Sequence, residues 1–60
     1  MTKYTHENGE VSTVVANPDG TVTVTSPYEG NYSGNISPEQ AEEEIINAGI
    51  KYGNKVVKKE

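Results

Sequence analysis

The sequence contains no cysteine, arginine, leucine, phenylalanine or tryptophan. Without cysteine, neither a disulfide framework nor a thiolate metal site can stabilise the fold. Without arginine, the chain lacks the forked side chain that reads guanine and phosphate, and its net charge of −4 opposes contact with a polyanion. We therefore expect no direct binding to nucleic acid.

Long apolar runs are also missing. No stretch approaches the ~18 residues that a membrane span requires. The first residues, Met1 to Glu7, lack the apolar segment of a secretion signal. We therefore expect a cytoplasmic protein that does not contact membranes.

The chain of 60 residues predicts a single small domain covering positions 1–60. At this size, the free energy gained by burying apolar surface nearly equals the entropy lost on ordering the chain. Since neither a disulfide nor a thiolate metal site is available, self-association is the remaining common route to stability. We expect a homodimer.

The first half of the chain predicts an antiparallel meander with strands at about 2–7, 10–16 and 21–26. Asn8-Gly9 predicts a two-residue type I′ turn. The second turn, 17–20, reads Asn-Pro-Asp-Gly and places a glycine at the left-handed bulge position. From these turns we expect His6 opposite Val11, and Val15 opposite Val22.

These registers divide the meander into two faces of different polarity. The face to be covered carries Tyr4, His6, Val11, Thr13, Val15, Val22 and Val24. The opposite face carries Lys3, Thr5, Ser12, Val14, Ala16, Thr21, Thr23 and Thr25. One mainly apolar and one mainly polar face is the pattern of a sheet that is covered on one side.

A helix is predicted over residues 38–48. Ser37 is its N-cap, Pro38 suits the first turn, and Gln40 completes a capping box. Gly49 is expected to end the helix in the left-handed conformation. The apolar positions of this helix should lie across the valine face of the meander.

The segments on either side of the helix are less regular. Residues 26–36 predict a loop, or a short irregular strand around 28–32. Residues 50–58 predict either a hairpin at Gly53-Asn54 or an edge strand over 55–58. The expected fold class is α+β: a three-stranded antiparallel meander, one helix packed on one face, and a C-terminal strand or hairpin.

Catalytic motifs are not found. His6 is the only histidine, and its place in the pattern favours a side chain at the rim of the core over a general base or a metal ligand. No nucleophile elbow, P-loop or dinucleotide fingerprint occurs. We expect no enzymatic activity, no cofactor and no metal.

The acidic residues near the start of the predicted helix allow three interpretations. Glu39, Glu42, Glu43 and Glu44 form a solvated acidic face, a pair of carboxylates with separated pKa values, or a surface for a basic partner. The first interpretation is favoured.

Three of the tyrosines are candidates for a binding surface, because tyrosine is enriched in interface cores. They are also candidates for anchoring the loop or filling the core, since larger apolar residues are absent. With three of the acids, they make up the candidate partner-binding set: Tyr28, Tyr32, Tyr52, Glu39, Glu42 and Glu43.

In being short, acidic and free of cysteine, the chain resembles small phage-encoded anti-defence proteins of the Hachiman anti-defence or anti-CRISPR type. The resemblance implies a non-enzymatic inhibitor, often a homodimer, that blocks a host defence protein sterically in the host cytoplasm. Two alternatives stay open from the residues. One is a nucleotide or small-molecule sponge with a pocket at a dimer interface, and the other is an acidic decoy of a nucleic-acid-binding protein.

Overall fold

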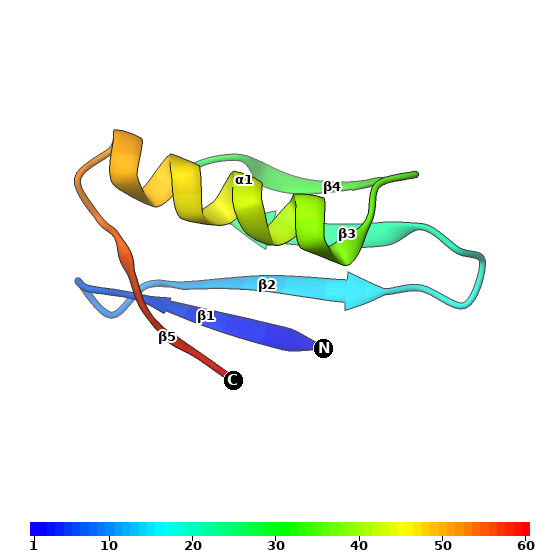
Figure 1. Ribbon diagram of the computed structural model, residues 1–60, viewed down its shortest axis with the longest axis horizontal. Coiled ribbons are helices and arrows are strands. Elements are labelled where there is room, and N and C mark those ends of the chain that lie inside the picture. The colour runs from blue at the N-terminus through cyan, green and yellow to red at the C-terminus, as the bar shows by residue number, and fades with distance from the viewer.

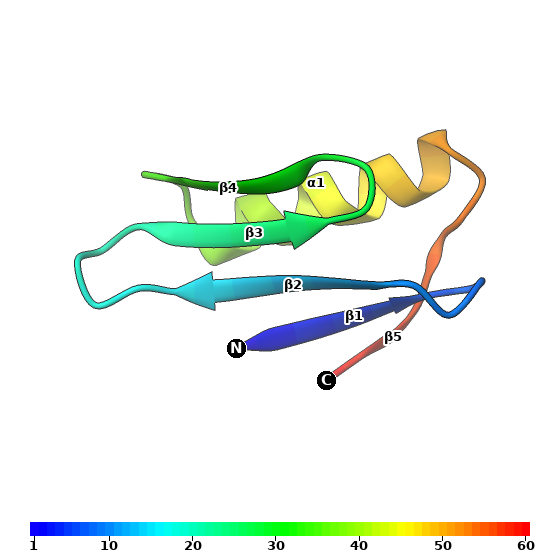
Figure 2. The ribbon, with the colours of Figure 1, turned by 180° about the vertical axis from the view of Figure 1, so that it is seen from behind.

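The computed structural model describes all residues from 1 to 60 and has an α+β fold. Five antiparallel strands form one open sheet, in the order β4-β3-β2-β1-β5, and a single helix covers one face (Figure 1). Seen from behind, the other face of the sheet is uncovered (Figure 2). The elements are β1 (Thr2–His6), β2 (Val11–Ala16), β3 (Val22–Ser26), β4 (Gly30–Gly34), α1 (Pro38–Lys51) and β5 (Val56–Lys59).

The first two hairpin turns each contain three residues. In the first, the His6 N–H donates to the Glu10 carbonyl at 2.8 Å, and the Gly9 N–H donates back to the His6 carbonyl at 2.9 Å. Gly9 takes the left-handed position with φ of 92°. The second turn is closed in the same way between Asn17 and Thr21. The predicted two-residue turn at Asn8-Gly9 is therefore wrong by one residue.

This difference shifts the register of β2 against both of its neighbours. Tyr4 pairs with Ser12, and Val14 pairs with Val24. The predicted pairs, His6 with Val11 and Val15 with Val22, are wrong because each turn holds one residue more than those registers assume. A shift of one residue turns every side chain of a strand to the other face.

The helix-covered face therefore carries Ser12 and Val14 from β2, in place of the predicted Val11, Thr13 and Val15. The residues predicted for this face on β1 and β3 do lie there. The core beneath the helix consists of Tyr4, Val14, Val22, Val24, Ala41 and Ile45, with Tyr32, Ile36 and Val56 packed against it.

Strand β4 is longer and more regular than the sequence predicts. All five of its residues pair with β3, from Gly30 opposite Ser26 to Gly34 opposite Val22. The strand begins after the turn 27–29, so Tyr28 lies in the turn and Tyr32 lies at the centre of the strand. The meander therefore has a fourth strand, which is one edge of the sheet.

The helix begins as predicted but ends later. The Ser37 hydroxyl accepts the Gln40 N–H at 3.0 Å. At the other end, the Gly53 N–H donates to the Ile50 carbonyl and the Asn54 N–H donates to the Gly49 carbonyl. These two bonds, with φ of 70° at Gly53, form a Schellman motif. The predicted end at Gly49 is wrong.

Gly49 is a glycine for a different reason. A Cβ atom at this position would lie 2.7 Å from the Asn54 carbonyl oxygen, so the helix can approach the following segment closely only without a side chain there. From Asn54 the chain returns to the sheet as β5, which pairs with β1. Of the two predictions for the C-terminal segment, the edge strand is correct.

Candidate binding site

A buried polar network joins the β1–β2 turn, the β3–β4 turn and the end of α1, and the candidate binding site lies directly above it. His6 is only 1% exposed. Its Nδ1 donates to the backbone carbonyl of Asn54 at 2.7 Å, because a carbonyl can only accept. Its Nε2 forms a second hydrogen bond with the Ser12 hydroxyl, also at 2.7 Å. Both ring nitrogens are engaged inside the protein, so His6 is a structural residue and lies deeper than the predicted rim of the core.

Asn54 is the centre of this network, although it is not among the site residues predicted from the sequence. Its Oδ1 accepts the backbone N–H of Asn8 at 3.0 Å. Its Nδ2 donates to the Tyr28 hydroxyl at 2.6 Å and to Glu10 at 3.2 Å. One buried amide thus fixes the β1–β2 turn and the β3–β4 turn to the end of α1. The sequence gives no separate signal for this role, since an asparagine after a glycine also reads as an ordinary turn residue.

Tyr28 and Tyr52 stack on one another above this network. Their ring centroids lie 5.1 Å apart and the ring planes differ by 10°. Tyr28 also packs edge-to-face against the His6 ring, with 5.7 Å between the ring centroids. Lys51 places its ammonium group 5.4 Å from the centre of the Tyr52 ring, within reach of a cation–π contact. Tyr52 nevertheless remains 57% exposed.

Tyr32 stands at the other end of the site and binds the helix. Its hydroxyl donates to Oε1 of Glu44 at 2.5 Å. This bond to a carboxylate, together with partial burial and the negative charge of Glu44, raises the pKa of Tyr32 to about 12. Tyr32 therefore fixes the distance between β4 and α1.

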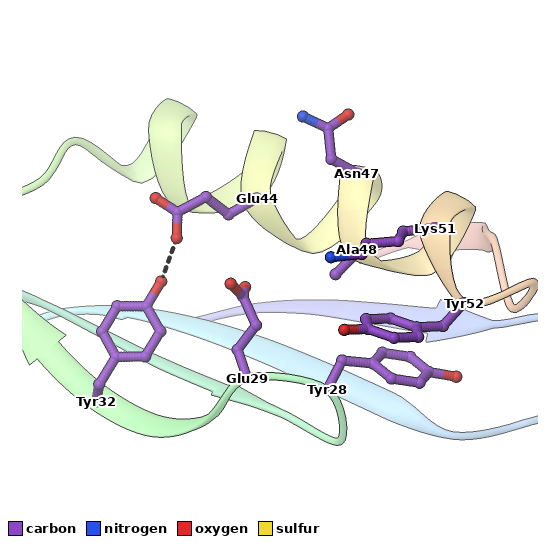
Figure 3. Close-up of a pocket in the computed structure, with 8 residues that line it drawn as sticks. All are labelled: Tyr28, Glu29, Tyr32, Glu44, Asn47, Ala48, Lys51 and Tyr52. Carbon is purple, nitrogen blue, oxygen red and sulfur yellow. Dashed lines mark hydrogen bonds between the residues drawn. The ribbon is translucent and has the colours of Figure 1, made fainter.

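These side chains line a groove of about 520 Å³ between α1 and the β3–β4 hairpin (Figure 3). The Glu29 side chain rises from the turn between Tyr32 and the stacked pair, and it forms no ion pair. We call this site the tyrosine groove, and its lining is Tyr28, Glu29, Tyr32, Glu44, Asn47, Ala48, Lys51 and Tyr52.

The three candidate tyrosines thus come together, whereas the three candidate acids lie elsewhere. Glu39, Glu42 and Glu43 line a separate hollow beside Ile46. The helix residues of the groove were not in the candidate set, although their spacing carries a signal. Positions 44, 47, 48 and 51 follow i, i+3, i+4 and i+7, which places them on one helix face.

Glu42 has a structural role. Its Oε2 accepts from the Lys59 ammonium at 2.8 Å and from the Tyr4 hydroxyl at 3.2 Å. The bond from Lys59 lowers the pKa of Glu42. Burial, followed by the bond to Glu42, raises the pKa of Tyr4 to about 12. Glu42 thus connects α1 to both β1 and β5.

No helix in the structure is both long and apolar enough to cross a membrane. No three histidine, aspartate or glutamate side chains converge in a way that could hold a metal ion. No family model, no curated protein and no solved structure matches this chain.

Proposed function

We propose that this protein is a small non-enzymatic binding module that holds a protein partner at the tyrosine groove and inhibits it by covering its surface. The observation that carries the proposal is the stacked pair of Tyr28 and Tyr52. Tyr28 is fixed from below by Asn54, yet Tyr52 keeps 57% of its surface exposed. Rigid, partly exposed aromatic side chains are typical anchors of protein interfaces, since little entropy is lost when they are covered.

The acidic decoy is less well supported by the charge arrangement. Glu42 is paired with Lys59, and Glu44 is engaged by the Tyr32 hydroxyl. Only some of the helix carboxylates are therefore free to imitate a row of phosphates. Binding through such a row would also weaken steeply with salt.

The ligand sponge has the volume of the groove in its favour, because small-molecule sites typically enclose ~300–1,000 Å³. The arrangement of the rings opposes it. Tyr52 lies between Tyr28 on one side and Lys51 on the other (Figure 3). A nucleobase would have to displace one of these neighbours before it could stack on Tyr52.

The test is capture from a nuclease-treated bacterial lysate with tagged wild-type protein, Tyr52→Ala and Val57→Ala. Val57 is the matched control, because it is also 57% exposed and lies on β5, outside the groove. We expect one stoichiometric protein partner with the wild type and Val57→Ala, and its loss with Tyr52→Ala.

Three results would contradict the proposal. Retention of the partner by Tyr52→Ala would exclude the groove as the binding surface. A partner recovered only when nuclease is omitted would support a function linked to nucleic acid. An empty wild-type bait together with a higher melting temperature in a nucleotide panel would favour the sponge.

A further inference from the structure

The two edges of the sheet differ in how well they are protected. The β5 edge carries Lys58 and Lys59, and its pairing with β1 is interrupted by a register shift. Lysines and irregular pairing are common devices that prevent an edge from accepting another strand. The β4 edge has neither: its sequence, Gly-Asn-Tyr-Ser-Gly, is uncharged, and its pairing with β3 is continuous.

The two glycines at the ends of β4 leave open space next to the groove. Tyr32 points to the helix-covered side, so alternation assigns Gly30 and Gly34 to that side as well. Nothing lies within 4 Å of the place where a Cβ atom would stand at either glycine. A strand added beside β4 could therefore direct a side chain past Gly30 into the tyrosine groove.

The charges around this space indicate which side chain fits. Glu29 forms no ion pair, and Glu44 accepts a hydrogen bond at only one of its two oxygens. The only cation in the lining, Lys51, lies over the Tyr52 ring. The groove thus combines carboxylate oxygens with aromatic walls, a combination that suits a guanidinium or ammonium group.

We infer that β4 accepts an extended segment of the partner protein as a sixth strand, and that the groove binds an arginine or lysine side chain of that segment between Glu29 and Glu44. This inference rests on the proposed function and names the kind of partner. Backbone hydrogen bonds to β4 supply affinity, and the groove supplies specificity, as in other complexes formed by strand addition.

A second copy of this chain is the less suitable occupant. Pairing β4 with itself would bring Glu29 and Glu44 of both copies to the same seam, and β4 offers no basic side chain to compensate them. A basic segment of another protein would instead be attracted, because its positive charge is complementary to the carboxylates of Glu29 and Glu44.

The test is selection from a yeast-displayed library of random nonapeptides, with wild-type protein, Glu29→Gln and Glu39→Gln as baits. Both substitutions remove one negative charge from an exposed residue, but only Glu29 lines the groove. We expect the wild type and Glu39→Gln to enrich β-branched sequences with one arginine or lysine at a constant position. Glu29→Gln should lose this preference.

An enriched peptide then tests both parts of the inference. Replacing its basic residue with leucine should weaken binding to the wild type about tenfold, in line with a charge-assisted contact of ~1.4 kcal/mol. Two further peptides should carry N-methyl groups at every second backbone nitrogen, one at the odd positions and the other at the even positions. Only one of these two sets of N–H groups faces β4 in an added strand, so only one of the two peptides should lose binding. On the protein, the peptide should shift the backbone amide resonances of residues 30–34.

Several outcomes would overturn the inference: no enrichment, enrichment without a basic residue, or resonance shifts confined to another surface. Concentration-dependent shifts of the β4 amides without peptide would assign the edge to a second copy. If the library fails while Tyr52→Ala still loses the lysate partner, only this inference fails. If the lysate capture fails as well, the proposed function fails with it.

Discussion

The imidazole of His6 donates a 2.7 Å hydrogen bond to the backbone carbonyl of Asn54, and this contact closes the corner on which the tyrosine groove is built. Gly49 lies at the same corner, where a side chain would collide with that carbonyl. The side chain of Asn54 then binds Tyr28, and Tyr28 stacks on Tyr52. The geometry of the proposed binding surface therefore depends on a buried polar contact between the start and the end of the chain.

Replacing Asn54 with alanine should be strongly destabilising. The change removes the bonds to Asn8, Glu10 and Tyr28 and leaves a partly buried backbone N–H without a partner. We expect a loss of about 2–4 kcal/mol in the free energy of unfolding, measured by urea denaturation. The control is Asn35→Ala, an exposed position, which should change stability by less than ~0.5 kcal/mol. Equal effects of the two changes would contradict the role of Asn54.

Two glycine substitutions should separate close packing from backbone strain. Gly49→Ala gains up to ~1 kcal/mol of helix propensity, but the added Cβ would lie 2.7 Å from a backbone oxygen that cannot rotate away. Overpacking of this kind costs about 1–3 kcal/mol, so we expect net destabilisation and a changed near-ultraviolet circular dichroism signal of the stacked tyrosines.

Gly53→Ala is the matched comparison. Its φ of 70° is strained for alanine, but the surrounding space is empty. We expect a loss of about 1–2 kcal/mol with an unchanged tyrosine signal. A stabilised Gly49→Ala protein would show that the approach of α1 to Asn54 is not close in solution.

Alkaline pH should destabilise the fold through two tyrosines. The pKa values of Tyr4 and Tyr32 are raised from 10.0 to about 12 in the folded protein, because of burial and bonds to carboxylates. The unfolded chain therefore releases these protons at lower pH than the folded chain. Stability is fully present below about pH 10 and falls progressively toward pH 12.

Urea denaturation at a series of pH values, with the tyrosinate absorbance followed in parallel, measures this effect. Glu44→Gln provides a check, because removing the carboxylate should bring the pKa of Tyr32 back toward its ordinary value. Stability that stays constant between about pH 9 and 12 would contradict the two tyrosine–glutamate bonds.

The homodimer remains a prediction from the small size of the core. Analytical ultracentrifugation at micromolar concentration should give twice the mass of 6.5 kDa. Thermal stability should also rise with protein concentration, because association stabilises the folded state by mass action. A monomer that unfolds only above about 60 °C, independently of concentration, would contradict the dimer.

The local elements of the fold were predictable from the sequence, whereas the contacts between them were less so. Ser37 and Pro38 set the start of the helix, and the strands of the first half lie within one residue of their predicted bounds. The register of β2 against β1 was predicted one residue out, because Asn8-Gly9 fits both a two-residue and a three-residue turn. Only the closing hydrogen bond from His6 to Glu10 distinguishes the two.

The site was predictable only in part, for the same reason. Tyrosine enrichment pointed to the residues at 28, 32 and 52, and the structure brings them into one groove. The helix end could not be placed from the sequence, since both Gly49 and Gly53 fit a left-handed terminus. The role of Asn54 could not be predicted without knowing where the helix ends. Asn54 reaches His6 only because the helix ends at Tyr52 and the chain then turns back toward the sheet.

The footprint of the captured partner on this protein shows whether the tyrosine groove and the β4 edge are the binding surface. Hydrogen–deuterium exchange should be compared for the free protein and for the complex. We expect slower exchange in residues 28–34 and around Tyr52 in the complex, with little change in β5. Protection confined to the uncovered face of the sheet or to β5, with β4 exchanging as fast as in the free protein, would contradict this binding surface.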